Sequence, residues 1–109
     1  MVGGVTKMVS IIRGTTPTIK YTFRIVEPSD IVTAVLTVKS RGTITITKTL
    51  EDATVGETDL SWTFTQEETL SLTAGQARMM LNWVTNGGTR GASAETAINV
   101  EQNQVKEVL

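Results

Sequence analysis

Two adjacent pairs of acidic side chains are the first residues in this sequence that could do chemistry. Glu51-Asp52 and Glu67-Glu68 each place two carboxylates next to each other along the chain. Glycoside hydrolysis needs two carboxylates that flank the same bond. Neighbouring residues on a strand point to opposite faces of a sheet, so adjacent acids cannot meet this requirement from a strand. We interpret both pairs as solvated acids of loops and turns.

Nucleophilic catalysis finds little support either, although the chain is rich in hydroxyl groups. The sequence contains no Cys and no His. This excludes thiol nucleophiles, imidazole bases and the usual zinc ligands. A lysine could still act as the base of a Ser–Lys dyad, but Lys20, Lys39 and Lys48 fall at strand positions that we expect to be exposed. The sequence therefore predicts no catalytic residues and no enzyme.

Two loops have compositions that could bind an ion. Residues 87–91 read Gly-Gly-Thr-Arg-Gly, and a glycine-rich backbone beside an arginine can hold a phosphate. The segment lacks the helix and the Lys-Ser/Thr pair of a P-loop, so we interpret it as part of a hairpin. Residues 51–59 hold four acids without the alternating spacing of a calcium loop. We predict no cofactor and no bound metal.

Charge and hydropathy limit the partners. The formal net charge is −1, and the basic residues are scattered from Lys7 to Lys106. Nucleic-acid binding needs clustered basic residues, so we expect no nucleic-acid partner. No apolar run approaches the roughly 20 residues that span a bilayer, and Met1–Lys7 does not have the pattern of a signal peptide. We expect no membrane partner and synthesis in a cytoplasm.

The first half of the sequence predicts strands. Threonine, the most frequent residue, is β-branched and favours strands. Apolar and polar residues alternate through residues 18–25, which predicts a strand with one buried face. Residues 31–39 predict a central strand, residues 40–42 a hairpin turn and residues 43–50 the returning strand. The residues expected on the buried faces of these two alternating strands are Ile19, Tyr21, Phe23 and Ile25, followed by Ile44, Ile46 and Leu50.

The second half predicts a helical turn between further strands. Thr65 and Glu68 have the spacing of a capping box, which predicts one short helical turn over residues 65–70. Asn86-Gly87 is a strong hairpin signal between strands at 76–84 and 92–100. We expect Trp62 and Trp83 in the core, with sugar-binding platforms as the alternative. The other residues expected on the buried faces are Leu60, Phe64, Met79, Leu81, Ala94, Thr96, Ile98 and Val100.

These elements predict an all-β fold. Six or seven short strands with regular turn signals are typical of an antiparallel β-sandwich, Ig-like or similar, and here it would carry one short helical turn near residues 65–70. We divide the chain into an N-terminal extension, residues 1–10, and a single β-sandwich domain, residues 11–109.

Two motifs carry a family resemblance. The segments 11–18, Ile-Ile-Arg-Gly-Thr-Thr-Pro-Thr, and 64–70, Phe-Thr-Gln-Glu-Glu-Thr-Leu, resemble those of short, uncharacterised phage and prophage proteins. That family is loosely similar to the N-terminal β-sandwich domain of phage baseplate upper proteins. The resemblance covers most of the chain from Ile11 onwards.

The resemblance implies a non-enzymatic structural component of a bacteriophage particle. The protein would be a tail or baseplate accessory, or a head decoration or fibre-anchoring protein, located in the virion. Its partners would be other phage structural proteins and repeated copies of itself, because a near-zero net charge limits self-repulsion. The expected contact residues are Arg13, Thr15, Thr16 and Arg90.

A second hypothesis belongs to another functional class. A small phage-encoded protein could inhibit a host defence protein or sequester its nucleotide signal. Arg13, Arg41 and Arg90 are the residues that could meet phosphates in that case.

Overall fold

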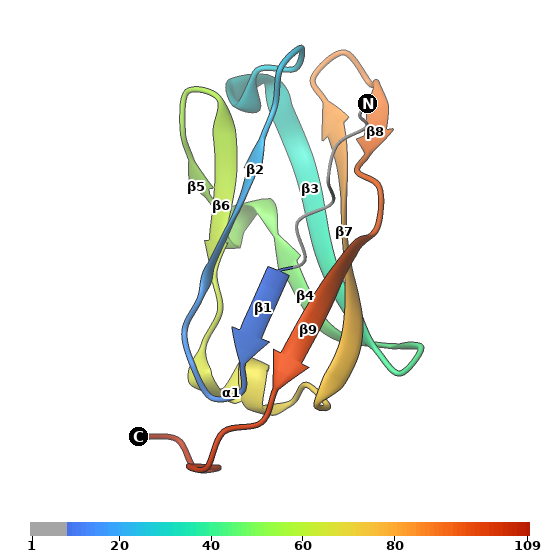
Figure 1. The fold of residues 1–109 in the computed structure, drawn as a ribbon. Coiled ribbons are helices and arrows are strands. Elements are labelled where there is room, and N and C mark those ends of the chain that lie inside the picture. The colour runs from blue at the N-terminus through green and yellow to red at the C-terminus, as the bar shows by residue number, and fades with distance from the viewer. Residues whose placement is uncertain (1–8) are drawn as a thin grey trace.

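Residues 9–109 are described by a computed structural model and form two β-sheets packed face to face (Figure 1). The larger sheet has the order β1-β9-β7-β3-β4, with β8 also paired to β7, and the smaller has the order β2-β6-β5. The strands are β1 (Val9–Ile12), β2 (Thr18–Thr22), β3 (Ile31–Ser40), β4 (Thr43–Thr49), β5 (Thr54–Val55), β6 (Asp59–Thr63), β7 (Gly75–Thr85), β8 (Arg90–Ala92) and β9 (Thr96–Glu101). The helical segments are the 3₁₀ turns η1 (Pro28–Asp30) and η2 (Leu50–Asp52) and the helix α1 (Gln66–Leu70).

The predicted all-β sandwich with one helical turn is confirmed. The predicted count of six or seven strands is too low, because the described residues form nine, several of which are very short. The all-antiparallel prediction is wrong for one pair, since β1 runs parallel to β9. These two strands lie far apart in sequence, so no hairpin turn imposes an antiparallel direction on them.

Part of the predicted N-terminal extension belongs to the sandwich. Residues 1–8 of the extension lie outside the described residues, and Val9 and Ser10 belong to β1.

Within residues 9–109, no helix has both the length and the apolar character needed to cross a membrane.

Alternate side chains from both sheets fill the space between them. Trp62 is 1% exposed, as predicted, and its indole N–H donates to the Thr49 carbonyl at 2.9 Å. Trp83 is only half-buried and packs against the margin of the core. The buried apolar residues are Ile11, Ile19, Ile31, Ala34, Leu36, Val38, Ile46, Leu60, Trp62, Phe64, Leu72, Ala77, Met79, Leu81, Ile98 and Val100.

A β-bulge in β4 reverses the face of one predicted core residue. Val38 of β3 pairs with Ile46, whereas the next residue, Lys39, pairs with Ile44, so Thr45 is an extra residue in β4. One extra residue reverses the alternation of side chains beyond it. Ile46 is therefore buried as predicted, but Ile44 points outwards and is 57% exposed. The prediction of a buried Ile44 is wrong for this reason.

A second irregularity divides the predicted strand at 92–100 into β8 and β9. Asn82 of β7 pairs with Ala92, and Met79 pairs with Thr96, so the β8–β9 side contains one residue more than β7. Ser93 fills this gap: its N–H donates to the Leu81 carbonyl at 2.8 Å, and its hydroxyl accepts the Leu81 N–H at 2.9 Å. Ile98 and Val100 are buried as predicted, but Ala94 lies between the strands and is exposed.

The alternating pattern covers residues 18–25, but the observed strand β2 ends at Thr22. Pairing between β2 and β6 ends where Thr22 meets Asp59, the first residue of β6. Without a partner strand, the alternation no longer fixes which face a side chain occupies. Phe23 remains half-buried, but Ile25 is 95% exposed, so the prediction of a buried Ile25 is wrong.

Gly91 provides a test of how tightly Trp83 packs across β8. An added Cβ would lie 2.5 Å from two ring atoms of Trp83, closer than packed atoms tolerate. We expect Gly91→Ala to lower the free energy of unfolding by about 1–3 kcal/mol through overpacking, although alanine normally suits a strand better than glycine. Urea unfolding would measure the loss.

The matched control is Gly87→Ala in the same hairpin. There the new methyl would meet only the Thr85 hydroxyl, at 4.0 Å. Equal stabilities for the two variants would contradict the packing of Trp83 on Gly91.

Candidate interaction surfaces

The predicted contact residue Arg13 joins three segments of its own chain. Its guanidinium donates to the Leu70 carbonyl at 2.7 Å and to the Gln102 side-chain oxygen at 2.9 Å. Its backbone N–H donates to the Glu101 carbonyl at 3.0 Å, and its carbonyl accepts the Asn103 side-chain N–H at 2.9 Å. Arg13 therefore holds the end of β1 against α1 and the segment after β9.

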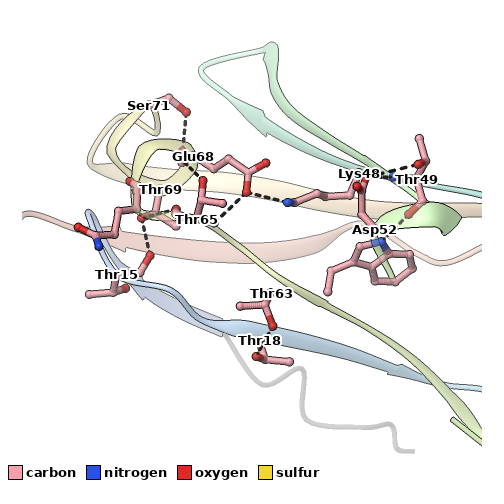
Figure 2. Close-up of polar contacts among 12 residues, drawn as sticks. Thr15, Thr18, Lys48, Thr49, Asp52, Thr63, Thr65, Glu68, Thr69 and Ser71 are labelled. Atoms are coloured by element: carbon pink, nitrogen blue, oxygen red, sulfur yellow. Dashed lines mark hydrogen bonds and ion pairs between the residues drawn. The ribbon is translucent and has the colours of Figure 1, made fainter. Parts of the chain in front are cut away.

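Thr69 of α1 fixes the bend that follows Arg13. This side chain is completely buried, accepts the Gly14 N–H at 2.9 Å and donates to the Thr15 carbonyl at 2.8 Å (Figure 2). Gly14 has a φ of +83°, in the left-handed region that suits glycine. The segment is thus a structural bend, and the exposed side chains of Thr15 and Thr16 remain accessible on it.

Arg90, the fourth predicted contact residue, lies at the other end of the sandwich, on β8 (Figure 1). It is exposed and donates to the Asn82 side-chain oxygen at 3.2 Å. The preceding turn is the predicted hairpin, closed by hydrogen bonds between the backbones of Thr85 and Thr89 and of Gly88 and Thr85. The structure therefore does not bring Arg90 together with Arg13.

The predicted capping box at α1 is confirmed, and it occupies one of the acids considered for catalysis. The Glu68 N–H donates to the Thr65 hydroxyl at 3.1 Å, while the Thr65 N–H donates to the Glu68 carboxylate at 2.9 Å (Figure 2). These contacts satisfy two backbone groups that the helix itself cannot pair. Glu67, next to it, is exposed.

Lys48 does not have the exposed position that its strand pattern predicted. Its ammonium lies 2.8 Å from the Glu68 carboxylate and 5.8 Å from the centre of the Phe64 ring, and its side chain is 11% exposed. Lys48 pairs with Leu36, a core residue of β3, so it projects from the inner face of the edge strand β4. The interpretation of Lys48 as a solvated side chain is wrong, because β4 lies at the edge of the sheet beside α1.

The ion pair sets the acidity of Glu68. Partial burial raises its pKa, but hydrogen bonds from Lys48 and Thr65 and the charge of Lys48 outweigh burial, so the pKa lies below that of an ordinary glutamate. An ion pair in contact with a helix cap is suited to holding α1 in place. It does not have the raised pKa that a general acid would need near neutral pH.

The acids of residues 51–59 are also used locally. The Asp52 carboxylate accepts the Thr49 backbone N–H at 2.9 Å and caps η2 (Figure 2). Asp59 lies 3.9 Å from the Lys20 ammonium. Within residues 9–109, no group of three or more carboxylates gathers in a way that could hold a metal ion.

An apolar hollow lies where the sequence predicted core. Phe23, Ile25, Val26 and Trp83 line a depression of about 400 Å³ next to Thr22 and Arg24. Phe23 and Trp83 meet edge to face, with ring centres 5.1 Å apart. Periodicity could not reveal this hollow, because it assigned Ile25 and Trp83 to the interior. The end of β2 pairing leaves Ile25 exposed, and Trp83 is half-buried beside it.

A comparison with protein-family models gives no match to this chain, and a comparison with curated proteins gives none.

Removal of the Arg13 side chain tests the structural role of its hydrogen bonds. Arg13→Ala deletes two charge-assisted hydrogen bonds, so we expect a loss of about 1–2 kcal/mol in the free energy of unfolding. Arg90→Ala removes one exposed contact and should change stability by less than about 0.5 kcal/mol. Chemical denaturation of both variants measures the difference, and equal losses would contradict the structural role of Arg13.

The Lys48–Glu68 pair predicts a defined dependence of stability on pH. Because folding lowers the pKa of Glu68, its contribution is complete above the pKa of the unfolded side chain, about 4.3, and is lost as the pH falls through the lower pKa of the folded state. Lys48→Met should therefore make the urea midpoint fall less steeply between about pH 5 and pH 3.

Lys20→Met is the matched control, because it removes a longer and more exposed ion pair. We expect this variant to keep the acid dependence of the original protein. If Lys48→Met also kept it, the pair would not be the cause of the lowered pKa.

Proposed function

We propose that this protein is a non-enzymatic structural component of a bacteriophage particle. It would serve as a tail or baseplate accessory, or as a head decoration or fibre-anchoring protein, in contact with other structural proteins and located in the virion. The fold is a small β-sandwich, and its function would be to bind protein surfaces.

The observation that carries the proposal is how the reactive side chains are used. Lys48 and Glu68 pair with each other against the cap of α1, and Asp52 caps η2. Arg13, the arginine of the motif at residues 11–18, bonds to backbone and amide oxygens of its own chain. These groups stabilise the fold, and none of them is presented to a substrate.

The exposed apolar hollow supports the same proposal. Ile25 is 95% exposed beside the half-buried Phe23, Val26 and Trp83. An accessible aliphatic and aromatic surface is typical of the centre of a protein–protein contact. The motifs at residues 11–18 and 64–70 supply the link to phage proteins, and both belong to the corner formed by the Arg13 bend and α1.

The nucleotide-sequestering alternative has less support. The three arginines invoked for it occupy separate places: Arg13 is bonded to α1, Arg41 lies in the β3–β4 hairpin, and Arg90 lies on β8 at the end of the sandwich opposite α1. One phosphate group could not contact both Arg13 and Arg90.

The experiment is to purify particles of the phage or prophage that encodes the protein and to quantify it by mass spectrometry. We expect a fixed copy number per particle. Ile25→Ser should reduce incorporation without lowering stability, because this side chain contributes almost nothing to the core. Val32→Ser, which alters an exposed valine on β3 outside the apolar hollow, is the control and should leave incorporation unchanged.

Presence of the protein only in infected cells, with none in purified particles, would refute the proposal. Equal incorporation of the Ile25 and Val32 variants would exclude the apolar hollow as the contact surface.

A further inference from the structure

Three basic side chains gather at one end of the larger sheet. Lys39, Arg41 and Arg78 line a hollow of about 360 Å³ near the β3–β4 hairpin, with Gly42, Gln76, Ala77 and Glu95. Lys39 and Arg78 are direct cross-strand partners, and both are exposed on the outer face. Like charges placed directly opposite each other destabilise a sheet. Glu95 is the one carboxylate among the residues that line this hollow, so the positive charges there are in excess.

The hairpin adds the third positive charge at a further conformational cost. Arg41 has a φ of +53° and Gly42 a φ of +79°, as in a two-residue turn with both residues in the left-handed region. Asn or Gly normally occupies the first position, because a larger side chain is strained there. Within residues 9–109, none of the three cations forms an ion pair within 4.0 Å. Strain and like-charge contact therefore coincide at one hollow.

A complementary acidic hollow lies at the opposite end of the sandwich. Glu27 and Glu57 line a depression of about 710 Å³ between the β5–β6 turn and η1, with Ser29, Val55, Gly56 and Thr58. Both carboxylates are exposed, and neither forms an ion pair with another described residue. Arg24 and Arg90 do not line it. Figure 1 places this turn and the β3–β4 hairpin at opposite ends of a domain that is 46 Å long, so the two hollows of one copy cannot meet.

We propose that the basic hollow of one copy binds the acidic hollow of the next, so that copies associate head to tail. The two surfaces differ, so the contact is heterologous and repeats into a line or closes into a ring. The formal net charge of −1 leaves no large excess of one sign, so repulsion between copies is small. The inference deepens the proposed structural role by naming one partner as a second copy of this chain.

The proposal predicts association that depends strongly on salt. Exposed ion pairs are individually weak and are screened over about 3 Å at 1 M salt, against about 30 Å at 0.01 M. In sedimentation velocity, we expect the sedimentation coefficient of the purified protein to rise with protein concentration at low salt. At high salt it should remain that of a monomer.

Charge reversal at each hollow gives the decisive comparison. Lys39→Glu/Arg78→Glu makes both ends acidic, and Glu27→Lys/Glu57→Lys makes both ends basic. Each variant alone should associate at least about tenfold more weakly than the original protein, whereas their equimolar mixture should associate again. Arg90→Glu/Lys106→Glu lowers the net charge as much as the first variant but lies outside both hollows, and it should associate normally. Circular dichroism checks that all variants fold.

The outcomes separate this inference from its alternatives. A monomer at low salt and high concentration would overturn it, as would a mixture of the two charge-reversed variants that stays monomeric. Chemical-shift changes at Lys39, Arg41 and Arg78 on adding inorganic pyrophosphate to a monomeric protein would assign the hollow to phosphate instead. These measurements use the purified protein alone. A lack of self-association would overturn this inference without contradicting the proposed role in a phage particle. Absence of the protein from particles would contradict that role without accounting for a lack of self-association.

Discussion

Strand β7 (Gly75–Thr85) imposes the constraint on which the rest of the structure depends, because it is hydrogen-bonded to other strands along both of its edges. One edge pairs with β3 and the other with β9 and then β8. This double pairing puts Ala77, Met79 and Leu81 into the core and leaves Arg78 outside. The charged face and the apolar interior are therefore consequences of one alignment of strands.

The corner at α1 connects this framework to the smaller sheet. Thr69, Glu68 and Arg13 act there as structural groups: a buried hydroxyl fixes the 13–17 bend, a carboxylate caps the helix, and a guanidinium binds the last carbonyl of α1. Positive charge at the C-terminal end of a helix is favourable, which adds to the effect of the hydrogen bonds. The motifs at 11–18 and 64–70 thus meet in space, although about 50 residues separate them in the sequence.

Strand β4 lies at an edge of the larger sheet, and two of its features oppose pairing with a further strand. A bulge at Thr45 and the inward-pointing Lys48 both interrupt the regular ladder that another strand could extend. The apolar hollow and the two charged hollows instead present side chains at the two ends of the sandwich.

Period-2 alternation, turn residues and the capping box were enough to determine an all-β sandwich, a helical turn at α1 and the burial of Trp62, because these depend on local geometry. The tertiary structure alone decided where Ile44, Ile25 and Lys48 point. A one-residue bulge reverses the face of Ile44, the end of strand pairing exposes Ile25, and the edge of the sheet turns Lys48 towards Glu68. The charged hollows could not be predicted for the same reason: each combines residues from separate strands and turns, and their register is set by pairing partners that are distant in sequence.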